Sequence, residues 1–276
     1  MIITFIGGGV MATALMGSLM ARGTSPTDIR IVEPGAEARD RLAAAYPGVA
    51  LYEVVGGEAL QGADVVVFAV KPQQMQPAAR ALAPHLGRAV QPVVLTIAAG
   101  IRLADLSRWL GRYGRLVRAM PNTPALIGKG ISGAFALPAV DAAGRAFAAE
   151  VLQAAGQLLW VATEPDLDAV TAVSGSGPAY VYYFLEALEE SARALGFSRA
   201  DARRLAHATF DGAVALAERS PHEPAVLRAQ VTTKGGTTER ALAMMEAAAV
   251  KSTIVAAVAA ACERAHELGD AYGSDA

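Results

Sequence analysis

The stretch FIGGGVMATAL, residues 5–15, is the strongest indication of the fold in the N-terminal part of this chain. An apolar strand-like run leads directly into three glycines, and an apolar helical pattern over Val10–Ala21 follows at once. The glycine stretch has the form G-x-G-x-x-A, which between a strand and a helix is typical of a dinucleotide-binding turn. We expect Gly7 to permit the tight turn, Gly9 to admit a pyrophosphate against the backbone, and Ala12 to allow close helix–strand packing. A glycine turn that holds no ligand is the alternative interpretation.

The composition is that of an apolar, core-rich globular protein of 276 residues, with 53% hydrophobic and 18% charged residues. This length is enough for two domains. Because the net charge is -2, we expect neither nucleic acid nor a membrane among the partners. The apolar N-terminal run breaks at Gly7 without a preceding basic region, unlike a signal peptide, and Ile254–Cys262 is too short to span a bilayer. The one cysteine has no partner for an intramolecular disulfide, and we expect a cytoplasmic protein.

Up to about Val161, strand-like segments alternate with helical ones. The expected strands are Ile2–Ile6, Ile29–Val32, Val65–Val70, Val93–Ile97, Arg115–Ala119, Ile131–Ala136 and Leu158–Val161. The expected helices are Val10–Ala21, Gln73–Ala83, Leu103–Leu110 and Asp141–Ala155. Continuous apolar strands are typical of a parallel sheet that helices cover on both faces. We therefore expect an α/β fold with a Rossmann-like, doubly wound sheet.

After Thr163 the strand signals stop and the chain becomes rich in alanine. The expected helices are Ala179–Leu195, Arg199–Ala217, Glu223–Ala229, Glu239–Ala247 and Val250–Leu268. Ser198 followed by Asp201 resembles a capping box at the start of one of them. The small residues would suit a subunit interface as well as a core. We expect a dinucleotide-binding domain over residues 1–162 and an all-helical domain over residues 163–276.

Glu33 ends the second expected strand, where a carboxylate can bind the ribose 2′-hydroxyl of a dinucleotide. Such a carboxylate favours NADH and repels a 2′-phosphate. Arg30 and Arg39 are close in sequence and could offset that charge. A solvated glutamate at a strand end is the alternative.

Two more segments end strands at the same edge of the sheet, where ligands bind in open parallel sheets. They are AVKPQ, residues 69–73, and IAAG, residues 97–100, whose small residues leave room for a cofactor. Lys71 has three interpretations: a catalytic acid, a phosphate contact or a solvated lysine. We assign it no proton transfer.

Three later motifs are more specific: RAMPNTPA at 118–125, SGSGPAY at 174–180 and VTTKGGTTERALAMME at 231–246. Together with AVKPQ and the glycine turn, they closely resemble the pyrroline-5-carboxylate reductases, in order from Ile2 to about Leu268. The resemblance implies hydride transfer from NADPH or NADH to the C=N carbon of pyrroline-5-carboxylate, which yields L-proline in the last step of proline biosynthesis. It also implies an N-terminal Rossmann domain and a C-terminal helical domain that forms a homodimer, with dimers often associating into decamers.

The segment TTKGGTT, residues 232–238, leads into the helix expected near Glu239. Two glycines before a helix N-terminus expose backbone N–H groups, which suit a small carboxylate such as that of the substrate. The resemblance implies that Thr238 is the catalytic residue and hydrogen-bonds the ring nitrogen. The alternative is that Thr237 or Thr238 only caps the helix. The implied substrate-binding residues are Thr233, Gly235, Gly236, Thr237, Thr238 and Ser176.

Two loops next to the expected helices complete the site that the resemblance implies. Asn122, between two prolines, would contact the nicotinamide, although the segment alone could be a turn. Ser176 would face the substrate cleft, although its segment could be a capped domain junction with Pro178 at the first helical position. The expected cofactor-binding residues are Ile6, Gly7, Gly8, Gly9, Val10, Met11, Glu33, Pro34, Ala69, Val70, Lys71, Pro72, Ala98, Ala99, Gly100 and Asn122.

The sequence also departs from the family pattern. Lys234 stands where many relatives have proline, and Gly56 and Gly57 stand where relatives often have an asparagine that contacts the cofactor. Glu33 replaces the small or basic residue of NADPH-preferring members, which leaves the cofactor preference open. We expect no metal, because the four histidines are scattered without metal-ligand spacing.

Two rival functions remain, and the 232–238 loop argues against both. A related imine or 2-hydroxyacid reductase would use a helix-borne lysine, for which Lys251 is a candidate. A non-catalytic NAD(P)-sensing module would keep the glycine turn but would not need the 232–238 loop.

Overall fold

A computed structural model describes residues 1–87 and 91–273. The chain divides into two compact units, Met1–Ser176 together with Ala261–Ala276, and Gly177–Ala260. The long last helix, α12 (Val250–Gly273), contributes to both units. Residues 163–176 group with the first unit, so this division differs from the expected domain boundary at 162/163, which stays a prediction.

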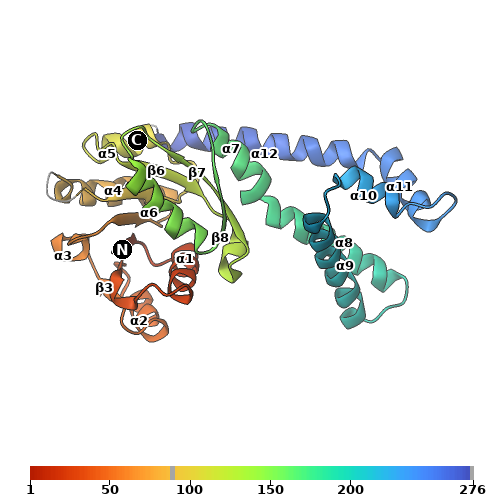
Figure 1. Ribbon diagram of the computed structural model, residues 1–276, viewed down its shortest axis with the longest axis horizontal. Coiled ribbons are helices and arrows are strands. Elements are labelled where there is room, and N and C mark those ends of the chain that lie inside the picture. Colours follow the sequence, from red (N-terminus) through yellow and green to blue (C-terminus); the bar gives the residue numbers. More distant parts are fainter. Residues whose placement is uncertain (88–90, 274–276) are drawn as a thin grey trace. The chain divides into compact units, whose positions relative to one another are not determined.

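The first unit is built on one sheet (Figure 1). Its strand order is β3-β2-β1-β4-β5-β6-β7-β8. The strands are β1 (Ile3–Ile6), β2 (Ile29–Val32), β3 (Ala50–Tyr52), β4 (Val65–Phe68), β5 (Val93–Thr96), β6 (Leu116–Met120), β7 (Gly130–Ala136) and β8 (Gly156–Trp160). All neighbours pair in parallel except β6 and β7, which are antiparallel. The doubly wound α/β fold is confirmed.

Two cores of buried side chains lie between this sheet and its helices. The helices cover both faces of the sheet (Figure 1). They are α1 (Val10–Ala21), α2 (Ala36–Ala45), α3 (Gly57–Leu60), α4 (Pro72–Leu82), α5 (Leu103–Trp109), α6 (Ala142–Gln153) and α7 (Asp166–Val170). One core joins Leu15 of α1 and Leu152 of α6 with Val67 of β4, whereas the other joins Met75 of α4 with Val66 of the same strand. Successive residues of a strand point into opposite cores, and for this reason these strands are continuously apolar.

The strand order reverses at β1, which pairs with β2 on one side and with β4 on the other. Their carboxyl ends lie together: Gly7 N donates to Val32 O at 2.8 Å, and Ala69 N donates to Ile6 O at 2.8 Å. A crevice outside the carboxyl ends of strands at such a reversal is where open α/β sheets bind ligands.

The second unit is all-helical. It contains α8 (Gly177–Ala194), α9 (Arg199–Arg219), α10 (Pro224–Gln230), α11 (Thr237–Ala247) and the first part of α12. The Ser198 half of the expected capping box is confirmed, since Asp201 N donates to Ser198 Oγ at 3.1 Å. The Asp201 carboxylate accepts from the Ser198 hydroxyl at 2.7 Å, in place of the Ser198 backbone N–H that a capping box uses. Within residues 1–87 and 91–273, no single helix is long and apolar enough to cross a membrane, but α11 and α12 taken together, with a bend of 51°, meet that length and composition.

Candidate functional site

A groove of about 580 Å³ opens over the glycine turn at the carboxyl ends of β1, β2 and β4. Most of the expected cofactor-binding residues line it, namely Ile6, Gly7, Gly8, Gly9, Glu33, Pro34, Ala69, Val70 and Lys71. Val10 and Met11 begin α1 directly after the turn, and Pro72 begins α4 directly after Lys71. The groove is also lined by residues beyond the short β3 that the sequence did not predict, namely Glu53, Val54 and Val55.

The glycine turn has the geometry that its pattern predicts. Gly7 has a φ of +97°, and a Cβ on it would stand 2.8 Å from Ala69 O, so the turn and β4 fit only with glycine there. Gly9 is the N-cap of α1 and makes no side-chain capping bond. The amide groups of the first turn of α1 have no partner within the helix and carry the positive end of its dipole. This is a suitable place for a pyrophosphate.

The Glu33 carboxylate is held against the glycine turn. Its Oε2 accepts from Gly8 N at 3.0 Å, and its Oε1 accepts from Gly35 N at 3.0 Å. The side chain is therefore fixed at the rim of the groove, unlike a freely solvated glutamate.

The second expected edge segment lies outside this groove. Ala98 is buried, and Gly100 has a φ of +76° and faces the ring of Tyr272, which an added Cβ would approach to 2.8 Å. Whether Ala98, Ala99 and Gly100 contact the cofactor stays a prediction.

Asn122 is buried and hydrogen-bonded within the protein. Its Nδ2 donates to Ser174 O at 3.1 Å, and its Oδ1 accepts from Ile131 N at 2.9 Å. The side chain thus ties the start of the loop after β6 to β7 and to the segment before Ser176. Its expected contact with the nicotinamide stays a prediction.

Ser176 follows a π-helix, Thr171–Gly175. This wide turn closes with a bond from Ser176 N to Thr171 O at 2.8 Å. Single π-turns are rare and occur frequently at functional sites. The segment is also the junction between α7 and α8, so both interpretations of it are compatible with the structure.

In the helical unit, the 232–238 loop ends at Gly236, which is the N-cap of α11. The helix starts at Thr237 and has no side-chain cap bond, so the alternative that Thr237 or Thr238 caps it is wrong. Gly235 has a φ of +74°, and its N–H donates to Glu239 Oε2 at 2.7 Å. One amide of this loop thus already holds a carboxylate oxygen.

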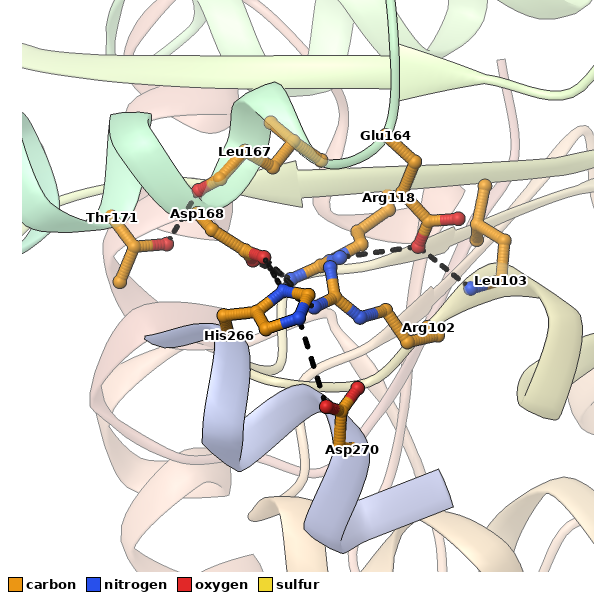
Figure 2. Close-up of polar contacts among 9 residues, drawn as sticks. All are labelled: Arg102, Leu103, Arg118, Glu164, Leu167, Asp168, Thr171, His266 and Asp270. Carbon is orange, nitrogen blue, oxygen red and sulfur yellow. Dashed lines mark hydrogen bonds and ion pairs between the residues drawn. The ribbon is translucent and has the colours of Figure 1, made fainter. Parts of the chain in front are cut away.

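An ionic cluster that the sequence did not predict lies in the first unit around Arg118 of β6 (Figure 2). Asp168 stands between two guanidinium groups, at 2.8 Å from Arg102 and 3.2 Å from Arg118. Arg118 also pairs with Glu164 at 3.1 Å, and His266 Nδ1 lies 3.5 Å from Asp168. Arg118 belongs to the RAMPNTPA motif, but no pattern in the sequence shows that it is buried among carboxylates.

In the described part of the chain, no three His, Cys, Asp or Glu side chains come together as metal ligands would. Lys251 is exposed near the start of α12.

Comparisons with known proteins agree with this geometry. A family model described as pyrroline-5-carboxylate reductase dimerisation matches residues 164–268, and one described as NADP oxidoreductase, coenzyme F420-dependent, matches residues 2–100. The pyrroline-5-carboxylate reductase of Pseudomonas aeruginosa is 43% identical over 98% of both chains.

Two solved structures share the whole fold. A pyrroline-5-carboxylate reductase from Coxiella burnetii has a TM-score of 0.89 and 36% identity, covering 96% of this chain and 97% of its own. The Plasmodium falciparum pyrroline carboxylate reductase, solved with NADP bound, has a TM-score of 0.85 and 26% identity, covering 97% and 98%. The dimerisation match indicates a homo-oligomer. This chain belongs to the pyrroline-5-carboxylate reductases and is an NAD(P)H-dependent oxidoreductase of that family.

Proposed function

We propose that this chain reduces pyrroline-5-carboxylate to L-proline, the last step of proline biosynthesis. Bound NADPH or NADH supplies a hydride to the C=N carbon, and the protonated ring nitrogen becomes the secondary amine of proline. The observation that carries the proposal is the groove over the glycine turn, in a chain whose 232–238 segment resembles the substrate loop of the family.

The residues that hold the dinucleotide are those around the groove. The pyrophosphate would lie on the amides of Gly9 and the first turn of α1, where the helix dipole favours an anion, because the Gly8 N–H is already bonded to Glu33. Glu33 and Pro34 face the adenosine ribose, and the 69–72 segment faces the other half of the molecule. Ala98, Ala99, Gly100 and Asn122 stay candidates for the nicotinamide end.

The substrate carboxylate binds the loop before α11. The amides in the first turn of α11 have no partner within the helix and attract anions. The Gly235 N–H donates to the Glu239 carboxylate, whose place the substrate carboxylate would take. Thr233, Gly235, Gly236 and Thr237 hold the substrate carboxylate, with Ser176 as a further candidate. Thr238 Oγ1 orients the ring nitrogen.

The chemistry does not require a dedicated general acid. A cyclic imine can enter the site already protonated, and the cation accepts hydride readily. The protein therefore acts by positioning the imine and by excluding other orientations.

The helical unit forms the homodimer. Many of its large apolar side chains are exposed in a single chain, including Tyr183, Leu216 and Met244. Exposed apolar surface of this extent marks an interaction site, and the dimerisation model matches this region. Association of dimers into a decamer, a cytoplasmic location and the absence of nucleic-acid or membrane partners complete the proposal.

The test is oxidation of NADH and NADPH in the presence of pyrroline-5-carboxylate, for the unchanged chain and Thr238→Ala. We expect turnover with at least one cofactor, and a fall of about 10²-fold in kcat for Thr238→Ala, because a hydrogen bond to the reacting centre is lost. Thr209→Ala, the same change on α9, is the control and should keep full activity. Absence of turnover in a folded protein that binds the cofactor would refute the proposal.

A further inference from the structure

We infer that this chain prefers NADH to NADPH, because the Glu33 carboxylate occupies the place of a 2′-phosphate and accepts a hydrogen bond from the ribose 2′-hydroxyl. The inference rests on the proposed function in one respect: the groove over the glycine turn must hold a dinucleotide. Membership of the family does not give this preference, because one member, from Plasmodium falciparum, was solved with NADP bound.

The position of Glu33 is fixed by the backbone on both sides. Gly8 N belongs to the glycine turn and Gly35 N to the loop that starts α2, and each donates to one carboxylate oxygen at 3.0 Å. The carboxylate cannot swing away without leaving these two N–H groups without their partner. The carboxylate also lies close to the backbone of Gly35, since a Cβ added to Gly35 would stand 3.2 Å from Glu33 Oε1.

A carboxylate in this place discriminates by charge and by hydrogen bonding. An ionised carboxylate only accepts hydrogen bonds, and its oxygens keep further lone pairs beside the two backbone bonds. A ribose hydroxyl can donate to such a lone pair. A 2′-phosphate is mainly a dianion at neutral pH, and this form has no proton to donate and is repelled by the like charge of the carboxylate.

The two arginines that could neutralise this charge are engaged elsewhere. Arg39 Nη1 donates to Glu33 O at 2.8 Å and to Pro34 O at 2.7 Å, and its Nη2 pairs with Glu53 at 3.3 Å. Arg30 Nη1 donates to Gln61 O at 2.6 Å, as well as to two neighbouring carbonyls. Both guanidinium groups are thus held by partners other than the Glu33 carboxylate.

The other charged side chains of the groove do not favour a 2′-phosphate either. Glu53 lines the same rim and forms an ion pair with Arg39, so this pair leaves the charge of Glu33 uncompensated. Lys71 lies beyond the end of β4, whereas Glu33 follows β2, and β1 separates these two strands. The adenosine end of the groove is therefore acidic, and Lys71 is placed toward the other end.

The experiment measures equilibrium binding of NADH and NADPH to the full chain by nicotinamide fluorescence, with ADP-ribose and 2′-phospho-ADP-ribose as competitors. These probes need no substrate and no turnover. We expect a Kd for NADH about tenfold or more below that for NADPH, and the same order for the two competitors. In Glu33→Gln the ratio should approach one, mainly because NADPH binds more tightly. The same substitution at exposed Glu37 in the first turn of α2, Glu37→Gln, should leave the ratio unchanged.

Equal or tighter binding of NADPH by the unchanged chain would overturn the inference while leaving the proposed reductase activity intact. Selective loss of NADPH binding in Arg39→Ala would also overturn the inference. It would show that Arg39 of the unchanged chain leaves its backbone partners and binds the 2′-phosphate. Failure of every nucleotide to bind a folded chain would refute the proposed function together with this inference.

Discussion

At the residue scale, the two glycines Gly7 and Gly9 of the glycine turn have different reasons to be glycine. Gly7 is needed by the backbone, because its φ is +97° and a Cβ would collide with Ala69 O at 2.8 Å. Gly9 has an ordinary φ of -72°, and the nearest atom to an added Cβ is Ala69 O at 3.9 Å. The protein itself therefore gives no reason for glycine at position 9, but a pyrophosphate against the backbone does.

We predict that Gly9→Ala leaves the melting temperature close to that of the unchanged chain but weakens nucleotide binding by about tenfold or more, because the methyl group occupies space next to the pyrophosphate. Gly7→Ala should lower both stability and binding. Thermal unfolding and fluorescence titration measure the two effects separately. Nucleotide affinity that is unaffected in Gly9→Ala would place the pyrophosphate elsewhere.

Some residues of the candidate site can be predicted from the sequence, whereas their partners cannot. The fingerprint grouped Gly7, Gly9 and Glu33, which the structure brings together around one groove, because the pattern itself encodes a turn between a strand and a helix. Their contact with a cofactor stays a prediction. The bonds of Arg39 to two backbone carbonyls could not be predicted, since they depend on the path of the loop after β2. The same is true of Asn122, whose partners lie on β7 and before Ser176.

At the scale of the elements, strong apolar patterns were predicted well and weak ones were missed. The expected helix over Val10–Ala21 is α1 with the same bounds, and most strands are shifted by only a residue or two at their ends. The missed α2 buries only Leu42, and the missed β3 is short and half-buried, so neither carries a clear apolar period.

The antiparallel strand β7 could have been anticipated from its connection. A parallel neighbour needs a crossover of about a dozen residues or more, usually a helix. The link from Met120 to Gly130 holds only a short 3₁₀ turn over Thr123–Ile127, so the chain turns back on itself. In contrast, the cluster around Asp168 joins segments that are distant in sequence, and only the fold brings them together (Figure 2).

The N-terminus of α6 gives a pH-dependent prediction. Asp141 caps this helix by accepting from Gly144 N at 2.8 Å and pairs with Arg115 at 3.1 Å. The hydrogen bond from Arg115, together with the one from Gly144, lowers the pKa of Asp141 below its ordinary value of 3.8. Because the folded state favours the ionised carboxylate, its contribution to stability is complete above that ordinary value and is lost as the pH falls through the lower folded pKa.

We therefore expect Asp141→Asn to melt at a lower temperature than the unchanged chain at neutral pH, with the difference shrinking as the pH falls below about 4. Asparagine can still accept from Gly144 N, so this variant removes mainly the charge. Asp141→Ala removes the cap as well and should be less stable at every pH. Thermal unfolding by circular dichroism across this range is the measurement, and a difference that grows toward acid would contradict the assignment.

At the scale of the whole molecule, the two units differ in how they are stabilised. The first unit has two cores on either side of its sheet. Among the described residues of Gly177–Ala260, only the small side chains Ala202 and Ala206 are buried, while many large apolar ones are exposed in a single chain. The sequence indicated alanine-rich helices here but could not decide between a core and an interface, because both bury the same apolar stripes.

A unit with so small a core needs a second copy of the chain to bury its apolar side chains, so we predict that folding of the helical unit is coupled to dimerisation. The melting temperature should then rise with protein concentration, since association stabilises the folded state by mass action. Tyr183→Asp on α8, which puts a charge on a side chain that is 71% exposed in the single chain, should shift sedimentation toward the monomer and remove most of this concentration dependence. Glu190→Asp on the same helix keeps the charge and is the control. A melting temperature independent of concentration, in a chain that sediments as a monomer, would show that the helical unit is stable without a partner and that its apolar faces are not the dimer interface.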